Sequence, residues 1–100
     1  MNIAIVCSPG MNNQDIIDNA IEEWMTQNDI WLFNVLCGKP DSAGAEWASR
    51  KGAPIIFDGV WHADFIFAFD TGVDYSVKNF VSQMKNKGKH GKYIQIGGLK

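Results

Sequence analysis

Three glycine-bearing loops contain the residues best suited to bind a small anionic ligand. They span residues 8–14, 38–42 and 70–76, and each follows an apolar segment and precedes a segment with helical spacing. The first backbone N–H groups of a helix have no partner within the helix, and such groups bind phosphate or carboxylate readily. The same glycines can equally serve only to close tight turns. Both interpretations stay open from the residues alone.

Two carboxylates and two thiols are the other candidates for chemistry. Glu46 can reach a ribose hydroxyl or act as a general acid or base, but it can also be a solvated helix carboxylate beside Trp47. Asp41 fits a helix N-cap better than a catalytic group. Cys7 and Cys37 each end an apolar segment, and buried thiols are favoured there over a redox pair. No His or Cys lies at the spacing of a metal site, so we expect neither a metal nor a cofactor.

The remaining charged and aromatic features suit surfaces better than catalysis. His90 lies in the segment 85–92, which bears four lysines. These cations can contact phosphate, although lysines after a helix more often complement its C-terminal dipole and solvate a loop. Trp31 and Trp61 belong to no apolar stripe and could anchor a subunit contact.

Composition narrows the class of protein. With 46% hydrophobic and 20% charged residues, the 100-residue chain is typical of one packed domain and not of a disordered tail. A net charge of −2 argues against duplex DNA or an anionic membrane as the main partner. No apolar run approaches the roughly 18 residues of a membrane span, and residues 1–7 resemble a strand more than a signal peptide. Two cysteines fit a reducing compartment, so we expect a cytoplasmic protein.

Hydrophobic periodicity places these residues on alternating strands and helices. We expect a single α/β domain with a Rossmann-like, mostly parallel five-stranded sheet and helices on both faces. The predicted strands cover residues 3–7, 30–37, 54–57, 63–69 and 92–96. The predicted helices cover about 13–28, 42–51 and 76–87, with Asp41 or Ser42 capping the second and Gly52 ending it.

One connection is too short for an ordinary crossover between parallel strands. Such a crossover usually takes a dozen or more residues, and the third and fourth predicted strands are separated by five. Asp58-Gly59 between apolar residues is a strong hairpin signal. We therefore predict a short hairpin at Asp58-Gly59, with Val60–His62 returning antiparallel to the third strand.

Three segments together form a recognisable pattern: GKPDSAGAEWASRKG at residues 38–52, ADFIFAFDTG at 63–72 and SVKNF at 76–80. They resemble the YspA-like (DUF2493) branch of the SLOG superfamily of Rossmannoid proteins, which also contains the LOG and DprA-like proteins. In that family a Gly-rich loop is followed by an Asp, a Glu-Trp-Ala helix and a Gly. An Ala-Asp strand ending in Ala-Phe then leads through a Gly-containing loop to a helix that begins Gly-Thr-Lys-Asn-Met.

The resemblance implies binding of a nucleotide-derived small molecule, such as an ADP-ribose-like compound, in the glycine loops. Family members are frequent in bacteriophage genomes, so sensing or sequestering a defence signal in the host cytoplasm is one expectation. With the loop positions, the resemblance nominates as ligand-binding residues Ser8, Pro9, Gly10, Gly38, Lys39, Asp41, Glu46, Thr71, Gly72, Ser76 and Asn79.

The departures from the family favour binding over catalysis. The first loop lacks the family's Arg, and the Gly-Thr of the phosphate-binding turn is Ser76-Val77 here. The family's Gly-rich segment with an Arg-Asn pair is replaced by residues 58–62, and the Pro-Gly-Gly-x-Gly-Thr-x-x-Glu pattern of its phosphoribohydrolases is absent. Only Glu46 remains as a catalytic candidate, and hydrolysis needs an acid/base and a phosphate clamp together.

Two alternatives remain beside ligand binding. The first is a ligand-free phage interaction or inhibitor module that uses Trp31, Trp61 and the lysine segment. The second is a phosphoribohydrolase that depends on Glu46. Under any of these functions we expect a homo-oligomer, most often a two-fold dimer, with no membrane or nucleic-acid partner.

Overall fold

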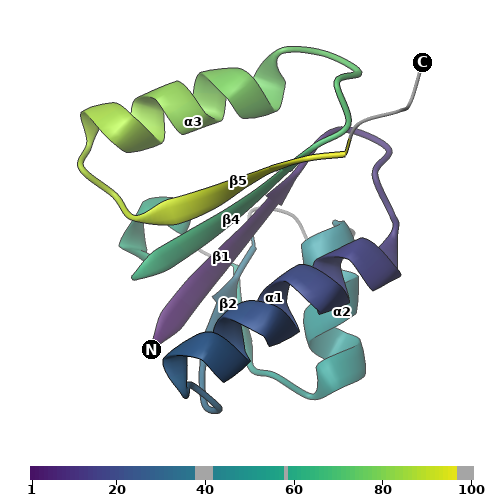
Figure 1. Cartoon of the computed structure of the whole chain (residues 1–100), viewed down its shortest axis with the longest axis vertical. Helices are drawn as coiled ribbons and strands as arrows, with labels where there is room; N and C mark the ends of the chain where they lie inside the picture. The colour runs from purple at the N-terminus through teal and green to yellow at the C-terminus, as the bar shows by residue number, and fades with distance from the viewer. Residues whose placement is uncertain (38–41, 58, 97–100) are drawn as a thin grey trace.

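The computed structural model describes residues 1–37, 42–57 and 59–96, and these form one parallel sheet between two layers of helices (Figure 1). Within the described residues all five strands are parallel, in the order β3-β2-β1-β4-β5. The strands are β1 (Asn2–Cys7), β2 (Asn34–Leu36), β3 (Ile55–Ile56), β4 (Phe65–Asp70) and β5 (Gly91–Gln95). The helices are α1 (Gln14–Asn28), α2 (Ala43–Lys51), the 3-10 turn η1 (Val60–His62) and α3 (Ser76–Asn86). The predicted Rossmann-like α/β fold is confirmed.

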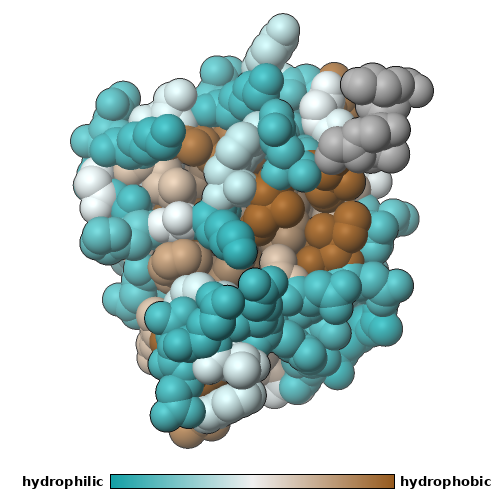
Figure 2. Space-filling model, in the orientation of Figure 1, coloured by the Kyte–Doolittle hydropathy of each residue, from teal (hydrophilic) through white to brown (hydrophobic). Residues whose placement is uncertain are grey.

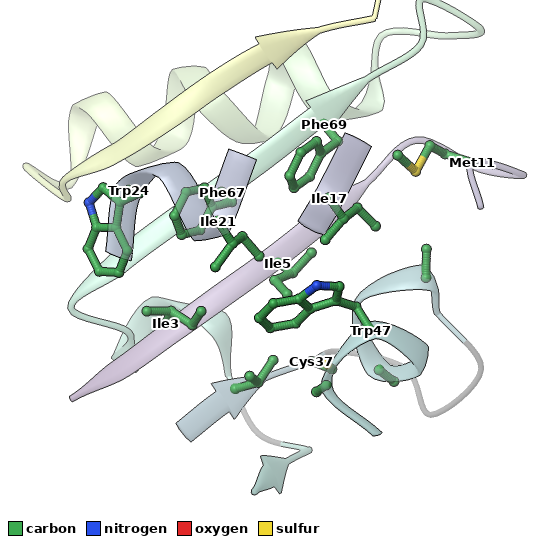
Figure 3. Packing of buried hydrophobic residues seen from close by; sticks show 14 residues of the cluster. Ile3, Ile5, Met11, Ile17, Ile21, Trp24, Cys37, Trp47, Phe67 and Phe69 are labelled. Atoms are coloured by element: carbon green, nitrogen blue, oxygen red, sulfur yellow. The ribbon is translucent and has the colours of Figure 1, made fainter. Parts of the chain in front are cut away.

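Helices cover both faces of the sheet because the strands are apolar on both sides. Alternate residues of β1 point in opposite directions, so Ile3 and Ile5 pack beneath α1 and α2 while Ala4 faces α3. On the α1–α2 side, the core includes Trp24, Trp47 and Phe67 (Figure 3). Each such side chain contributes about 1.5–3 kcal/mol of hydrophobic stabilisation when buried.

On the α1 side of the sheet, the helices cover the sheet less completely near β5. Ile94 and Ile96 are only half-buried at the margin of the α1-side core. Figure 2 shows hydrophobic residues reaching the surface between α1 and the end of β5. An apolar surface therefore lies next to the carboxyl ends of the strands.

The helix boundaries follow the capping groups of the sequence. Asn13 accepts a hydrogen bond from the Ile16 N–H at 3.2 Å and starts α1. Ser42 accepts one from the Ala45 N–H at 3.2 Å and starts α2, and Gly52 ends α2 with φ of 72°. Of the two caps predicted for α2, Asp41 or Ser42, the structure has Ser42, and the predicted stop at Gly52 is confirmed.

A close approach fixes α2 against the central strand. A Cβ atom at Gly44 would lie 2.8 Å from the Cβ and Cγ2 atoms of Ile5, which is closer than real contacts allow. Glycine at this position therefore lets the start of α2 pack directly on β1.

The predicted hairpin is wrong. Asp58 lies outside the described residues, but Val60–His62 forms a 3-10 turn and not a strand, and Gly59 has φ of −58° where the hairpin turn needs a positive value. Trp61 stacks on Phe80 with ring centroids 4.6 Å apart, which draws the segment onto the α3 face. A short crossover suffices because β3 is short. Residues 57–64 can reach roughly 26 Å, whereas three strand spacings take about 14 Å.

The second strand is shorter than predicted. The apolar run 30–37 contributes only Asn34–Leu36 to the sheet, and residues 30–33 form a loop. In that loop Ile30 and Phe33 pack against the core while the two residues between them are exposed. An apolar run alone does not distinguish a strand from a loop anchored by alternate side chains.

No helix among the described residues has both the length and the apolar character needed to cross a bilayer.

Candidate functional site

The strand order reverses between β1 and β4, and this point is the structural candidate for a ligand site. The chain leaves β1 towards α1 on one face of the sheet and leaves β4 towards α3 on the other (Figure 1). In open α/β sheets, ligands bind in the crevice that such a divergence leaves at the carboxyl ends of the strands. Cys7 is paired with Phe69 in the register, so Ser8 and Asp70 are the first residues beyond that pair.

A buried hydrogen-bond network joins the two loops at this point. The Ser8 hydroxyl donates to Asp70 Oδ1 at 3.2 Å and accepts from the Thr71 N–H at 3.0 Å. The Ser8 N–H donates to the Phe69 carbonyl at 3.0 Å. Ser8 and Asp70 are 3% and 1% exposed, so the network is shielded from water and fixes one loop against the other.

The Asp70 carboxylate has two further partners. Its Oδ1 accepts from the Gly72 N–H at 2.8 Å, and its Oδ2 accepts from the Tyr93 hydroxyl at 2.5 Å. The Tyr93 hydrogen bond, together with those from Gly72 and Ser8 and the charge of Lys78, outweighs burial and lowers the pKa of Asp70. The carboxylate therefore stays ionised and serves to position the loop after β4.

Glycines in both loops have conformational roles. The Met11 N–H donates to the Ser8 carbonyl at 3.1 Å, with Pro9 second and Gly10 third in the turn. Gly10 has φ of 78°, as the third position of a type II turn requires. Gly72 has φ of 82°. Tight turns explain these two glycines, and the first turn exposes Pro9 and Gly10 next to the buried Ser8.

The loop after β4 leads into the start of α3. Asp74 accepts hydrogen bonds from the Ser76 N–H at 2.9 Å and the Ser76 hydroxyl at 2.7 Å, and these hydrogen bonds lower the pKa of Asp74. Tyr75, at the N-cap position, makes no side-chain capping bond, and the first turn of α3 holds Lys78 but no acid. Asn79 is exposed on the same turn.

Glu46 is not part of this crevice. It is exposed on α2 and lines a hollow with Ile55 and Phe57 over β3. Because β2 and β1 lie between β3 and β4, Glu46 is on a different part of the sheet from Asp70. The predicted ligand residues Gly38, Lys39 and Asp41 lie outside the described residues.

The structure thus groups only some of the nominated residues. Ser8, Thr71 and Gly72 share one network, and Pro9 and Gly10 continue from it. Ser76 and Asn79 lie on the adjacent helix start.

Sequence reasoning missed two residues of the network. Asp70 begins the predicted loop 70–76 but is not among the nominated ligand residues, although a carboxylate directly after an apolar run is an available signal. The sequence carries no comparable signal for Tyr93, because its contact with Asp70 depends on β5 lying next to β4.

Three hollows on the described part of the surface are lined by none of the residues of the Ser8–Asp70 network. One of 160 Å³ separates α1 from α2, one of 320 Å³ lies beside the α1–β2 loop, and one of 570 Å³ is the hollow beside Glu46. We call the surface between the β1 and β4 loops, around Ser8 and Thr71, the shelf.

The thiols are unsuited to nucleophilic chemistry. Burial, with a smaller contribution from nearby Cys37, raises the pKa of Cys7 to about 12, and burial also raises the pKa of Cys37. Both cysteines are free. Protonated thiols are poor nucleophiles and poor metal ligands. In residues 1–37, 42–57 and 59–96, no three His, Cys, Asp or Glu side chains gather as a metal site would require.

Comparisons with protein-family models, curated proteins and solved structures find no match to this chain.

Proposed function

We propose that this protein binds a nucleotide-derived small molecule of the ADP-ribose kind on the shelf between the β1 and β4 loops. The observation that carries the proposal is the network of Ser8, Asp70 and Thr71, which braces the two loops at the point where the strand order reverses. Because hydrogen bonds already hold the two loops in place, ligand binding does not incur the entropy cost of ordering them.

The surroundings of the shelf suit the two ends of such a ligand. At the start of α3, Asp74 already accepts from the Ser76 N–H, and the positive dipole end and Lys78 favour a phosphate beside this capped turn. Half-buried Ile94 and Ile96 offer apolar surface near the same edge for a flat base. Asp70 is buried and fully engaged, so its role is to hold the loop and not to contact the ligand. Sequestering a host signal molecule, as a phage counter-defence protein would, is the role that the SLOG resemblance favours.

A ligand that binds only the folded state raises the free energy of unfolding. At a free ADP-ribose concentration of 100 times Kd the gain is about 2.7 kcal/mol. For a domain of this size, that gain corresponds to a rise in Tm of roughly 10–20 °C. Differential scanning fluorimetry with ADP-ribose, AMP and NAD measures the shift.

Matched variants locate the effect on α3. Lys78→Ala should reduce the ADP-ribose shift, whereas Lys85→Ala, an exposed lysine in the last turn of the same helix, should leave it unchanged. The absence of any shift across the nucleotide panel, or equal losses in the two variants, would count against the shelf.

A protein-interaction module is the second candidate, favoured by one observation. Trp31 and Leu32 are 61% and 87% exposed next to the 320 Å³ hollow, and large apolar side chains rarely cluster on a free surface. This candidate predicts a partner complex that depends on Trp31 and is indifferent to Lys78. A phosphoribohydrolase is less well supported, because Glu46 lies over β3 and apart from the shelf.

A further inference from the structure

The loop between α1 and β2 exposes two large apolar side chains although the loop itself is anchored. Ile30 and Phe33 pack against the core, and the Ile30 N–H donates to the Met25 carbonyl at 3.0 Å. Between them, Trp31 and Leu32 are 61% and 87% exposed. Their exposure is therefore a property of an ordered loop that turns these two side chains outward.

An apolar hollow lies beside these side chains. It measures 320 Å³, and its walls include the rings of Phe33 and Trp47, which stack with centroids 6.0 Å apart and planes inclined by 14°. We call the larger apolar residues of this surface the Trp31 patch; they are Met25, Trp31, Leu32, Phe33, Trp47 and Pro54.

Trp31 is held in place before any partner arrives. Its indole N–H donates to Asp29 Oδ1 at 2.9 Å, and Asp29 itself takes the left-handed conformation that ends α1, with φ of 54°. A rigid aromatic side chain loses little conformational freedom when it is buried at an interface. Exposed Trp side chains of this kind are typical interface anchors.

One acid and one base line the hollow. Glu22 and Lys51 are joined at 2.9 Å, and Lys51 also pairs with Asp18 of α1 at 2.7 Å. A rim that carries both signs of charge can pair with an identical rim. Two copies facing each other across a two-fold axis can exchange these contacts, each Glu22 meeting the opposite Lys51.

We propose that the Trp31 patch is a self-association surface, on which a second copy of this chain docks about a two-fold axis. A projecting Leu32 beside an apolar hollow is self-complementary, because each copy can insert Leu32 into the hollow of the other. A stable interface buries about 800 Å² per partner, roughly one-seventh of the 5884 Å² surface. The interface must therefore include the rim of Glu22 and Lys51 as well as the loop.

This surface is distinct from the shelf proposed for ligand binding. The α1–β2 loop precedes β2 and so lies at the amino ends of the parallel strands, whereas Ser8 and Asp70 lie at the carboxyl ends. A dimer through the Trp31 patch leaves the shelf open, and either proposal can fail without the other.

Light scattering on a sizing column, from low-micromolar to hundred-micromolar protein, tests the proposal. The wild type should be a dimer at high concentration, and Leu32→Glu should weaken the dimer by at least about tenfold because a charge would be buried. Val73→Glu is the matched control, since Val73 is 63% exposed but lies in the loop between β4 and α3. Tryptophan emission should shift to shorter wavelength with concentration in the wild type and not in Leu32→Glu.

Circular dichroism should show the wild-type fold in Leu32→Glu, because Leu32 is 87% exposed. If that variant does not fold, Leu32→Ala provides the same comparison with a milder change. A monomeric wild type at every concentration, a dimer that survives both Leu32 variants, or a stable complex with a different protein in place of the dimer would each overturn the proposal.

Discussion

Asp70 is the residue on which the geometry of the candidate site depends. Its carboxylate is the acceptor for Ser8, Gly72 and Tyr93, which come from the β1 loop, the β4 loop and β5. A buried carboxylate with this many donors is stabilised in its charged form. A substitution at Asp70 should therefore disturb hydrogen bonds to all three segments.

Replacing Asp70 with Asn keeps the shape and removes the charge. We expect Asp70→Asn to lower the free energy of unfolding at pH 7 by about 1–3 kcal/mol, because hydrogen bonds to a charged acceptor are stronger than those to a neutral amide. Urea unfolding at pH 7 measures the loss. Asp64→Asn, which changes an exposed carboxylate with one backbone donor, should cost much less.

The same variant should change the response to acid. The folded pKa of Asp70 lies below its ordinary value of 3.8, so its contribution is fully present above that value and is lost as the pH falls through the folded pKa. The stability difference between wild type and Asp70→Asn should therefore shrink below about pH 4. Asp18 and Asp74 also have lowered pKa values but are shared by both proteins. A pH-independent difference would contradict this role of Asp70.

At the scale of elements, a hydrogen bond and two ion pairs join α1 to α2, in addition to the apolar contacts between the two helices. The Trp47 indole N–H donates to Asp18 Oδ1 at 3.1 Å, and the Lys51 ammonium lies 2.7 Å from the same oxygen. Lys51 also pairs with Glu22. Trp47 is 2% exposed, so Asp18 is the partner of a buried donor, whereas Glu22 only joins a surface pair.

Alanine substitutions should separate these two roles. Asp18→Ala leaves the buried indole N–H of Trp47 without its acceptor and should lower the free energy of unfolding by about 1–3 kcal/mol. Glu22→Ala removes an exposed ion pair and should cost no more than about 1 kcal/mol. Urea unfolding of the two variants at neutral pH makes the comparison, and equal losses would show that the indole contact contributes little.

The elements were largely predictable because their signals are local. The helix caps at Asn13 and Ser42 and the stop at Gly52 act on adjacent backbone groups, so the sequence alone contains them. The turn Val60–His62 was mispredicted because Trp61 stacks on Phe80 from a distant helix, and that tertiary contact overrides the local preference of the Asp-Gly pair.

At the scale of the whole molecule, strand order decides which residues meet. Ser8, Thr71 and Gly72 were predicted at the loop edge, and the pairing of β1 with β4 brings them into one network. Tyr93 could not be foreseen there, because the sequence does not state that β5 is the neighbour of β4. Ligand binding by these residues stays a prediction.

Charge is unevenly distributed along the chain. All eleven acidic residues precede residue 76, and residues 76–100 contain six lysines and no acid. The described lysines of this stretch lie on α3 and β5 and on the turn that joins them. Of these described lysines, Lys78 lies at the start of α3 beside the shelf, whereas the other four lie at the end of α3 and the start of β5, towards the amino ends of the strands.

The central claim is that the shelf between the β1 and β4 loops binds an ADP-ribose-like ligand. Backbone amide chemical shifts of the ¹⁵N-labelled protein, recorded during titration with ADP-ribose, test it most directly because they report the site as well as the binding. The largest changes are predicted for Ser8, Gly10, Thr71, Gly72 and Lys78. No changes at saturating ADP-ribose, or changes confined to Glu46 or to the Trp31 patch, would contradict the claim.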